Sequence, residues 1–386
     1  MKRTIAFALL LLCFGAQAQT TSIITGAART KEYLPLLQGK RVALLVNQTA
    51  TIGNTHLVDS LLKLKVKITK IFSPEHGFRG NADAGEKIAN SKDAATGLTI
   101  VSLYGKHRKA DANDLKDVDV LIFDIQDVGA RFYTYISSLQ ELMESAAANK
   151  KLLIVLDRPN PNGHYVDGPI LDTAFRSFVG MQQIPIVHGM TVGEYAKMLN
   201  GEKWLEKKRN CNLKVITCLG YTHNSRYELP VKPSPNLPNM ASIYLYPSTC
   251  FFEGTPVSLG RGTDKPFQVF GHPDFPKNLY QFTPRSVPGA KNPPLLDKLC
   301  YGYDLSNSVQ EIDNKLQLKW VIKAYELFPQ KDKFFTNFFN TLAGNSTLQA
   351  QIKAGKSEAE IRQSWEPGLS KFKKTRKKYL LYKDFE

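Results

Sequence analysis

The feature that most limits the fold of this chain is a regular alternation of strand-like and helix-like segments in its first half. Short, continuous apolar runs predict buried strands, and longer runs with apolar residues at helical spacing lie between them. The predicted strands cover 41–46, 66–72, 98–103, 118–123 and 152–156, and the predicted helices cover 55–64 and 132–149. Such alternation predicts an α/β fold, in which a parallel sheet carries helices on both faces.

The pattern changes at about residue 205. A proline-rich stretch at 232–238 predicts a loop or an extended segment. Strand-like segments follow at 243–246 and around Phe251, and helical patterns return at 309–326 and 348–356. Because one core rarely serves a chain of this length, we expect two domains. The first would cover residues 19–204, and a smaller α+β domain would cover 205–386 and complete the pocket.

The first 18 residues are expected to be a secretory signal peptide. Lys2 and Arg3 precede an apolar run, and Ala16-Gln17-Ala18 offers a cleavage site between small residues. The apolar run is too short to span a bilayer, and no later run is longer. We therefore expect an exported protein, periplasmic or secreted, with no stable membrane anchor.

The formal net charge of +16 suits an anionic partner, such as an envelope glycan that bears carboxylates. Nucleic acid would fit the charge equally well, but it does not fit an exported protein. The basic, aromatic tail at 371–382 is either a solvated or packed chain end or a polyanion site.

Several cofactor and metal motifs are absent from the sequence. The turn after the first strand, at 47–54, lacks the glycine pattern that binds dinucleotides. Phosphate-binding Walker loops and Gly-x-Ser-x-Gly elbows are also absent. The cysteines that follow the signal peptide have neither zinc spacing nor a disulfide framework. They are Cys211, Cys218, Cys250 and Cys300. We expect no cofactor and no metal.

Polar or charged residues follow every predicted strand of the first half. Parallel strands end at one edge of a sheet, and ligands of open α/β sheets bind at that edge. We therefore expect these side chains to share one site. They are Asn47 after the first strand, Glu75 and His76 after the second, Tyr104, His107 and Arg108 after the third, Asp124, Gln126, Asp127 and Arg131 after the fourth, and Asp157, Arg158 and Asn160 after the fifth.

Glu75 is the leading candidate for a general acid. It lies in Ser73–Gly80, where a proline ends the strand and glycines bracket an acid and a histidine. A partly desolvated carboxyl group can hold its proton near neutral pH. The structural alternative is a turn in which Glu75 caps a following helix. Two carboxylates across a glycosidic bond are the usual machinery of glycoside hydrolysis, and Asp124 and Asp127 are the candidate partners.

Other residues are candidates for substrate binding. Arg79 and Arg131 can bind an anionic group, and Gln126 can bind sugar hydroxyls. Tyr133 and Tyr135 either form a wall for a sugar ring or pack in the helix. A loop of the second domain with Glu253 and Arg261 can complete the pocket, since ligand sites are common at domain interfaces. His188 is either a rim residue or a structural histidine.

A series of motifs, in a fixed order, resembles the bacterial exo-β-N-acetylmuramidases of the NamZ type. The resemblance covers roughly residues 25 to 386. The motifs are Ser73–Gly80 with Ala84–Lys87, Ser102–Gly105, Phe123–Tyr135, Leu156–Pro161, His188–Glu194, Pro233–Pro238, Tyr246–Thr255 and Gly260–Thr263.

The resemblance implies a Rossmann-like catalytic domain and a smaller C-terminal domain. It also implies the release of terminal, non-reducing β-1,4-linked N-acetylmuramic acid from peptidoglycan fragments, without a nucleotide cofactor. The Glu of the family's Pro-Glu-His-Gly motif falls on Glu75. The lactyl carboxylate of N-acetylmuramic acid suits Arg131, Arg158 or Arg261.

The sequence leaves alternatives open for both the mechanism and the function. The partner of Glu75 can be Asp124, Asp127, Glu253 or the substrate's own 2-acetamido group, so retention or inversion is not predicted. A non-catalytic envelope protein that binds muropeptides between two domains is the alternative function. A wall-binding structural protein would need the basic tail. The oligomeric state is not predicted.

Overall fold

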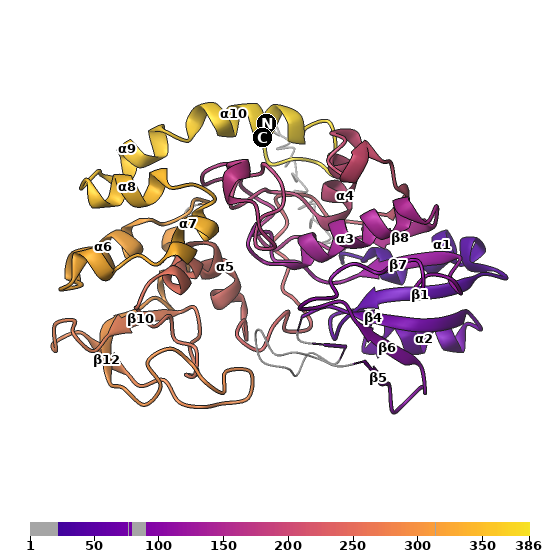
Figure 1. Cartoon of the computed structure of the whole chain (residues 1–386), viewed down its shortest axis with the longest axis horizontal. Helices are drawn as coiled ribbons and strands as arrows, with labels where there is room; N and C mark the ends of the chain where they lie inside the picture. The colour runs from indigo at the N-terminus through magenta and orange to yellow at the C-terminus, as the bar shows by residue number, and fades with distance from the viewer. Residues whose placement is uncertain (1–21, 76, 79–89, 313) are drawn as a thin grey trace, which may run out of the picture.

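The computed structural model describes residues 22–75, 77–78, 90–312 and 314–386. Its first region is a seven-stranded sheet with helices on both faces, and its second region combines a three-stranded antiparallel sheet with several helices. Figure 1 shows the two regions side by side, with α10 (Glu366–Arg376) running along one side of both. The predicted fold class, an α/β sheet domain with a smaller C-terminal domain, is confirmed.

The large sheet has the strand order β5-β6-β4-β1-β7-β8-β9. Its strands are β1 (Arg41–Val46), β4 (Lys67–Ser73), β5 (Ser91–Lys92), β6 (Thr99–Ser102), β7 (Val120–Asp124), β8 (Leu152–Leu156) and β9 (Asn212–Ile216). All neighbours pair in parallel except β5, which is antiparallel to β6. Numbered along the chain, the parallel strands follow the order 3-2-1-4-5-6 of the Rossmann fold. A short hairpin of β2 (Thr51–Ile52) and β3 (Thr55–His56) follows β1.

The strands are apolar throughout because both faces of the sheet are covered. Alternate residues point to opposite faces, so Val42 and Leu44 pack with α1 (Thr30–Leu37) and α2 (Leu57–Lys63). Ala43 and Leu45 pack on the other face with α3 (Tyr135–Ala148) and α4 (Val192–Gly201). The predicted strands and helices of this region are thus present, with shifted ends.

The second region begins after the proline-rich loop. Its helices are α5 (Met240–Thr249), α6 (Lys319–Leu327), α7 (Asn337–Ala343), α8 (Thr347–Lys353), α9 (Glu358–Gln363) and α10. Its strands are β10 (Val269–His272), β11 (Tyr280–Phe282) and β12 (Cys300–Asp304), and its longer 3-10 helices are η4 (Cys250–Gly254) and η5 (Ser308–Ile312). No described helix is long and apolar enough to cross a membrane. Cys211, Cys218, Cys250 and Cys300 are buried free thiols.

The prediction of strands at 243–246 and around Phe251 is wrong. These residues form α5 and η4. Ile243 and Tyr246 lie on one face of α5 and Leu245 lies on the opposite side, yet all three are buried. A helix that is buried on several faces has no amphipathic period, so its sequence resembles a buried strand. The start of α5 is fixed by a capping box between Asn239 and Ser242.

The sheet continues past the predicted domain boundary at residues 204/205. β9 lies beyond that boundary, yet it pairs with β8 and completes the large sheet. Its alternating exposed and half-buried residues are typical of an edge strand, and they lack the continuous apolar run that marks the other strands.

The end of the chain returns to the first region after α10. The Tyr382 hydroxyl donates to Asp157 at 2.5 Å, and the Leu381 amide donates to Glu194 at 2.8 Å. One continuous apolar core includes residues of α3, α4, α5 and α10. The two regions are therefore packed as one body, which fixes the geometry of the cleft between them.

Candidate active site

Glu75 lies in a tight turn directly after β4. Pro74 follows the last residue of the strand, and the Gly77 amide donates to the Pro74 carbonyl at 3.1 Å. Gly77 has a φ of +75°, which favours glycine at this position. Phe78 is buried and packs edge-on against His56, so the turn is anchored to the structure after β1. This turn holds the half-buried Glu75 at the wall of a cavity.

The cavity has a volume of about 280 Å³ and lies between the two regions. The first region contributes residues that follow β4, β6, β7 and β8. The second contributes residues of the proline-rich loop, α5, η4, α7 and the loop after η4. The lining residues used below are Glu75, Tyr104, Arg108, Tyr133, Thr134, Tyr135, Phe178, Ser234, Tyr246, Glu253, Arg261 and Phe338.

Two neutral hydroxyl groups hold the Glu75 carboxylate. The Tyr104 hydroxyl donates to Oε1 at 3.0 Å, and the Thr134 hydroxyl donates to Oε2 at 3.3 Å. Burial, followed by the charge of Glu75, raises the pKa of Tyr104 well above its usual value. Tyr104 therefore keeps its proton and remains a donor. Because Tyr104 follows β6 and Thr134 precedes α3, the side chain of Glu75 is fixed from two neighbouring loops.

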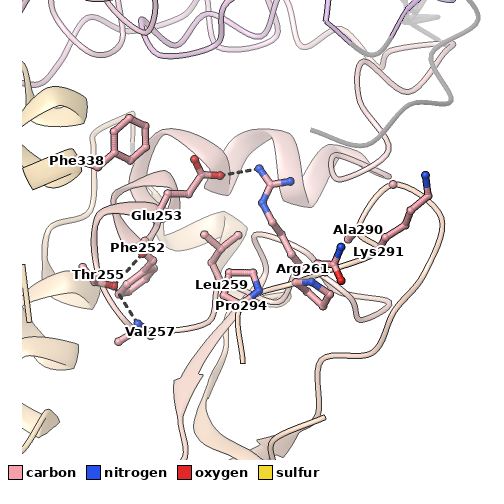
Figure 2. Close-up of a pocket in the computed structure, with 13 residues that line it drawn as sticks. Phe252, Glu253, Thr255, Val257, Leu259, Arg261, Ala290, Lys291, Pro294 and Phe338 are labelled. Atoms are coloured by element: carbon pink, nitrogen blue, oxygen red, sulfur yellow. Dashed lines mark hydrogen bonds and ion pairs between the residues drawn. The ribbon is translucent and has the colours of Figure 1, made fainter. Parts of the chain in front are cut away.

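A second carboxylate, Glu253, lines the cavity from the other region. Its Oε1 accepts from Arg261 Nη2 at 2.6 Å, and the Arg261 guanidinium lies 5.0 Å from the centroid of the Phe267 ring. The same ion pair lines a larger neighbouring cavity of about 710 Å³, formed entirely by the second region. Figure 2 shows the Glu253 and Arg261 side chains pointing toward each other in that cavity, with Phe338 nearby. The two cavities thus meet at the ion pair.

Seven of the residues that the sequence suggested for the site line this cavity: Glu75, Tyr104, Arg108, Tyr133, Tyr135, Glu253 and Arg261. His76 and Arg79 lie outside the described residues. His107 is exposed and contacts Asp114. The other predicted residues are buried elsewhere, and their contacts show why they do not reach the cavity.

Asp124, a predicted partner of Glu75, does not line the cavity. Asp124 and Arg158 form a buried, bidentate ion pair with N–O distances of 2.5 and 2.9 Å, and Arg158 also donates to the Thr51 carbonyl. Nearby Asn47 is also fully buried and accepts from Thr49. The crevice between β1 and β7, the topological switch point where ligands of such sheets usually bind, is therefore filled by protein side chains.

Asp127 and Gln126 are also buried behind the cavity rather than on its wall. Asp127 Oδ2 accepts from the Gly129 amide at 2.6 Å, while no described residue bonds Oδ1. Burial raises the pKa of Asp127 to about 7. Gln126 donates to the carbonyls of Asp127 and Pro159, both at 2.8 Å. These residues fix the loop that follows β7.

Arg131 cannot bind a substrate carboxylate in this structure. Its side chain is fully buried, and its guanidinium donates to four backbone carbonyls. These belong to Pro169, Ile184, Leu342 and Ala343. Because Leu342 and Ala343 lie in α7, Arg131 joins the two regions, and its role is structural.

Asp157, Asn160 and His188 hold loops together and do not face the cavity. Asp157 accepts from Thr191, Gly193 and the chain end, and burial raises its pKa to about 6. Asn160 donates to the Met190 carbonyl at 2.8 Å. His188 Nδ1 accepts from the Met190 amide, and burial lowers the pKa of His188 to about 3. A capping box of Thr191 and Glu194 fixes the start of α4, and its Ser/Thr-x-x-Glu spacing is a signal that the sequence carries locally.

Arg108 was expected at this edge of the sheet, whereas several other lining residues were not singled out from the sequence. Arg108 belongs to the polar cluster after the third predicted strand, and Thr134 lies within Phe123–Tyr135. Ser234 and Tyr246 lie in the other quoted motifs. Phe178 and Phe338 carry no local signal, because only the tertiary fold brings them to the cavity.

The chemistry of the cavity is that of a carbohydrate site. Aromatic walls from Tyr133, Phe178 and Tyr246 surround two carboxylates and two guanidinium groups. Among the described residues, no group of three or more His, Cys, Asp or Glu side chains is placed to hold a metal ion. Two carboxylates from opposite walls are the arrangement that glycoside hydrolysis requires.

Comparisons with known proteins agree with this chemistry. Models of the two domains of exo-β-N-acetylmuramidase NamZ match residues 42–241 and 244–382. The peptidoglycan β-N-acetylmuramidase NamZ of Bacillus subtilis (strain 168) is 40% identical over 376 residues, which cover 91% of this chain and 89% of that protein.

Two solved structures of DUF1343 family proteins from Bacteroides fragilis NCTC 9343 are similar to the whole fold. One is 51% identical with a TM-score of 0.88 and covers 94% of this chain and 100% of that chain. The other is 29% identical with a TM-score of 0.78 and covers 94% and 99%. With both domain models matched in order along the chain, the protein belongs to the exo-β-N-acetylmuramidase NamZ family of glycosidases.

Proposed function

We propose that this protein releases N-acetylmuramic acid from the non-reducing ends of peptidoglycan fragments, with Glu75 as the general acid. The observation that carries the proposal is the position of Glu75 on the wall of the interdomain cavity. Of the carboxylates that end the strands of the large sheet, Glu75 lines that cavity, whereas Asp124 and Asp157 are enclosed by protein.

The volume of the cavity supports exo-action. Ligand pockets usually measure roughly 300–1,000 Å³, and this cavity, at about 280 Å³, is slightly smaller. Such a space suits one sugar residue rather than a length of glycan. A single terminal sugar would bring its glycosidic oxygen to Glu75, and the leaving group would extend out of the cavity.

The two carboxylates reach the cavity from different regions, Glu75 from the first and Glu253 from the second. Glu253 forms an ion pair with Arg261, so it supplies a fixed negative charge that can stabilise the oxocarbenium-like transition state. Glu75 is held by the hydroxyl groups of Tyr104 and Thr134. We assign Glu75 the role of proton donor to the glycosidic oxygen and Glu253 the role of its partner.

The test measures kcat of the wild-type protein and of Glu75→Gln on two substrates. One is the disaccharide in which N-acetylmuramic acid is linked to N-acetylglucosamine, whose leaving group needs a proton. The other is the 4-nitrophenyl glycoside of N-acetylmuramic acid, whose leaving group departs without one. We expect kcat on the disaccharide to fall about 10²- to 10⁴-fold. The loss on the nitrophenyl glycoside should be much smaller.

Glu326→Gln is the matched control, because Glu326 is an exposed carboxylate of α6 that pairs with Lys323. It should leave both rates unchanged. Near-normal disaccharide turnover by Glu75→Gln would remove Glu75 from the acid role. Binding of the disaccharide by the wild-type protein without release of free sugar would favour the muropeptide-binding alternative instead.

We also propose that the protein is exported, because its charge and its peptidoglycan substrate suit the cell envelope. The predicted signal peptide, residues 1–18, lies outside the described residues. N-terminal sequencing of the mature protein from a cell fractionation should find a start after Ala18 in the periplasmic or secreted fraction. An unprocessed N-terminus in the cytoplasmic fraction would contradict export.

A further inference from the structure

The substrate proposed above carries a feature that distinguishes it from N-acetylglucosamine, namely the lactyl carboxylate. A site that selects N-acetylmuramic acid needs a cation for this group. The arginines suggested by the sequence are poorly placed, since Arg131 and Arg158 are buried in internal contacts. Arg261 reaches the cavity, but its guanidinium is already paired with Glu253.

Among the residues that the structure describes, Arg108 is the other arginine that lines the cavity. It is exposed, and within the described part of the chain its guanidinium forms neither an ion pair nor a hydrogen bond. The guanidinium carbon lies 4.4 Å from the centroid of the Phe178 ring. Stacking on an aromatic face orients a guanidinium while its N–H groups remain available at the edges.

The neighbours of Arg108 are occupied by other contacts. His107 Nε2 lies 2.9 Å from Asp114 Oδ2, and Lys109 Nζ lies 2.8 Å from Glu206 Oε2. These contacts fix the loop on both sides of Arg108. The middle residue of three consecutive basic residues is thus presented to the cavity, while its two neighbours are held by carboxylates.

The surface that supports Arg108 is fixed as well. The Ser137 hydroxyl donates to the Phe178 carbonyl at 2.7 Å, which ties the Phe178 loop to α3. Tyr104, from the same loop as Arg108, binds the catalytic candidate Glu75. One short segment therefore positions both Glu75 and Arg108 around a cavity that holds a single sugar.

We propose that Arg108 binds the lactyl carboxylate of N-acetylmuramic acid and sets the preference of the enzyme for this sugar. This inference rests on the proposed function. A guanidinium can bind a carboxylate through two parallel N–H···O bonds, and a neutral amide cannot replace that charge. Hydrogen bonds to charged groups contribute about 1.5–3 kcal/mol, which corresponds to about 10- to 100-fold in kcat/KM.

The test measures kcat/KM for matched disaccharides in which the terminal sugar bears a lactyl carboxylate or a lactyl carboxamide. The wild-type protein should prefer the carboxylate. Arg108→Ala should lower kcat/KM for the carboxylate about 10- to 100-fold, mainly through KM, and should leave the carboxamide unchanged. Arg108→Lys should recover part of the preference, since lysine keeps the charge but not the paired donors.

Lys106→Ala is the matched control, because Lys106 is an exposed cation of the same loop that does not line the cavity. This change should leave kcat/KM unchanged for both disaccharides. An equal loss by Arg108→Ala on both substrates would overturn the assignment while leaving the proposed function intact.

A second measurement separates the two proposals. Binding of free N-acetylmuramic acid and its carboxamide can be measured by calorimetry with Glu75→Gln as the parent protein. The carboxylate preference should disappear when Arg108→Ala is added. If the wild-type protein turns over neither disaccharide, the proposed function fails, and this binding preference still decides the role of Arg108.

Discussion

Both halves of the carboxyl edge of the large sheet carry carboxylate side chains, but these side chains lie in different surroundings. After β4, Glu75 is half-buried and lines a cavity, where two hydroxyl groups hold it. At the ends of β7 and β8, Asp124 and Asp157 are fully buried and bound by protein groups. A carboxylate at the end of a parallel strand is therefore not by itself a sign of catalysis.

The difference lies in what covers each half of the edge. The ends of β7 and β8 are covered by Arg158, by the start of α4 and by the returning chain end with Tyr382. The ends of β4 and β6 face the second region across the cavity. The carboxylates of Asp124 and Asp157 are therefore bound by protein groups, whereas Glu75 faces the cavity.

The largest effect on stability is expected from Asp124→Ala. This change leaves Arg158 as an unpaired charge in the interior, which costs about 3–5 kcal/mol. Urea unfolding should show the loss as a lower midpoint. Glu75→Gln is the matched carboxylate change on the open half, and its free energy of unfolding should stay within about 0.5 kcal/mol of wild type. Equal stability of the two variants would contradict the proposed difference between the buried Asp124 and the cavity-lining Glu75.

Asp127→Asn tests the buried half of this edge through the pH dependence of the unfolding free energy. Burial raises the pKa of Asp127 to about 7 from an ordinary value of 3.8. Between these values the folded state binds more protons than the unfolded state, so this group makes stability fall as pH rises from about 4 to about 7. Above about pH 7 the wild-type protein carries the full cost of an ionised buried carboxylate.

The neutral amide introduced by Asp127→Asn does not ionise, so it does not add this pH dependence to the stability. The stability of Asp127→Asn relative to wild type should rise through that window by roughly 2–4 kcal/mol, when unfolding is measured at a series of pH values. A difference between the two proteins that stays constant from pH 4 to 8 would show that Asp127 is not the titrating group.

Tyr382→Phe gives the smallest expected effect. It removes the hydrogen bond that the hydroxyl donates to the buried Asp157 and the one that it accepts from the Cys218 amide, and it should cost about 2 kcal/mol in unfolding free energy, with turnover unchanged. Tyr379→Phe is the control from the same tail, because its hydroxyl bonds Glu202 nearer the surface and should cost less. A loss of turnover in folded Tyr382→Phe would link the chain end to the site.

The local parts of this protein could be predicted from its sequence. Apolar runs located the buried strands, and Thr191 with Glu194 located the start of α4, because these signals involve residues close together in the chain. The same local logic failed for α5, which is buried on several faces and has no helical period. It also failed for β9, an edge strand with little apolar character.

The sequence by itself determined that polar residues end the parallel strands and that Glu75 lies among them. Only the tertiary structure decided which of these strand ends stays open. Arg131 illustrates the reason, because its partners in α7 lie more than 200 positions away in the chain. Asp157 likewise meets Tyr382 from the far end of the chain. Coverage of an active-site edge depends on such distant contacts, and no local pattern of residues encodes them.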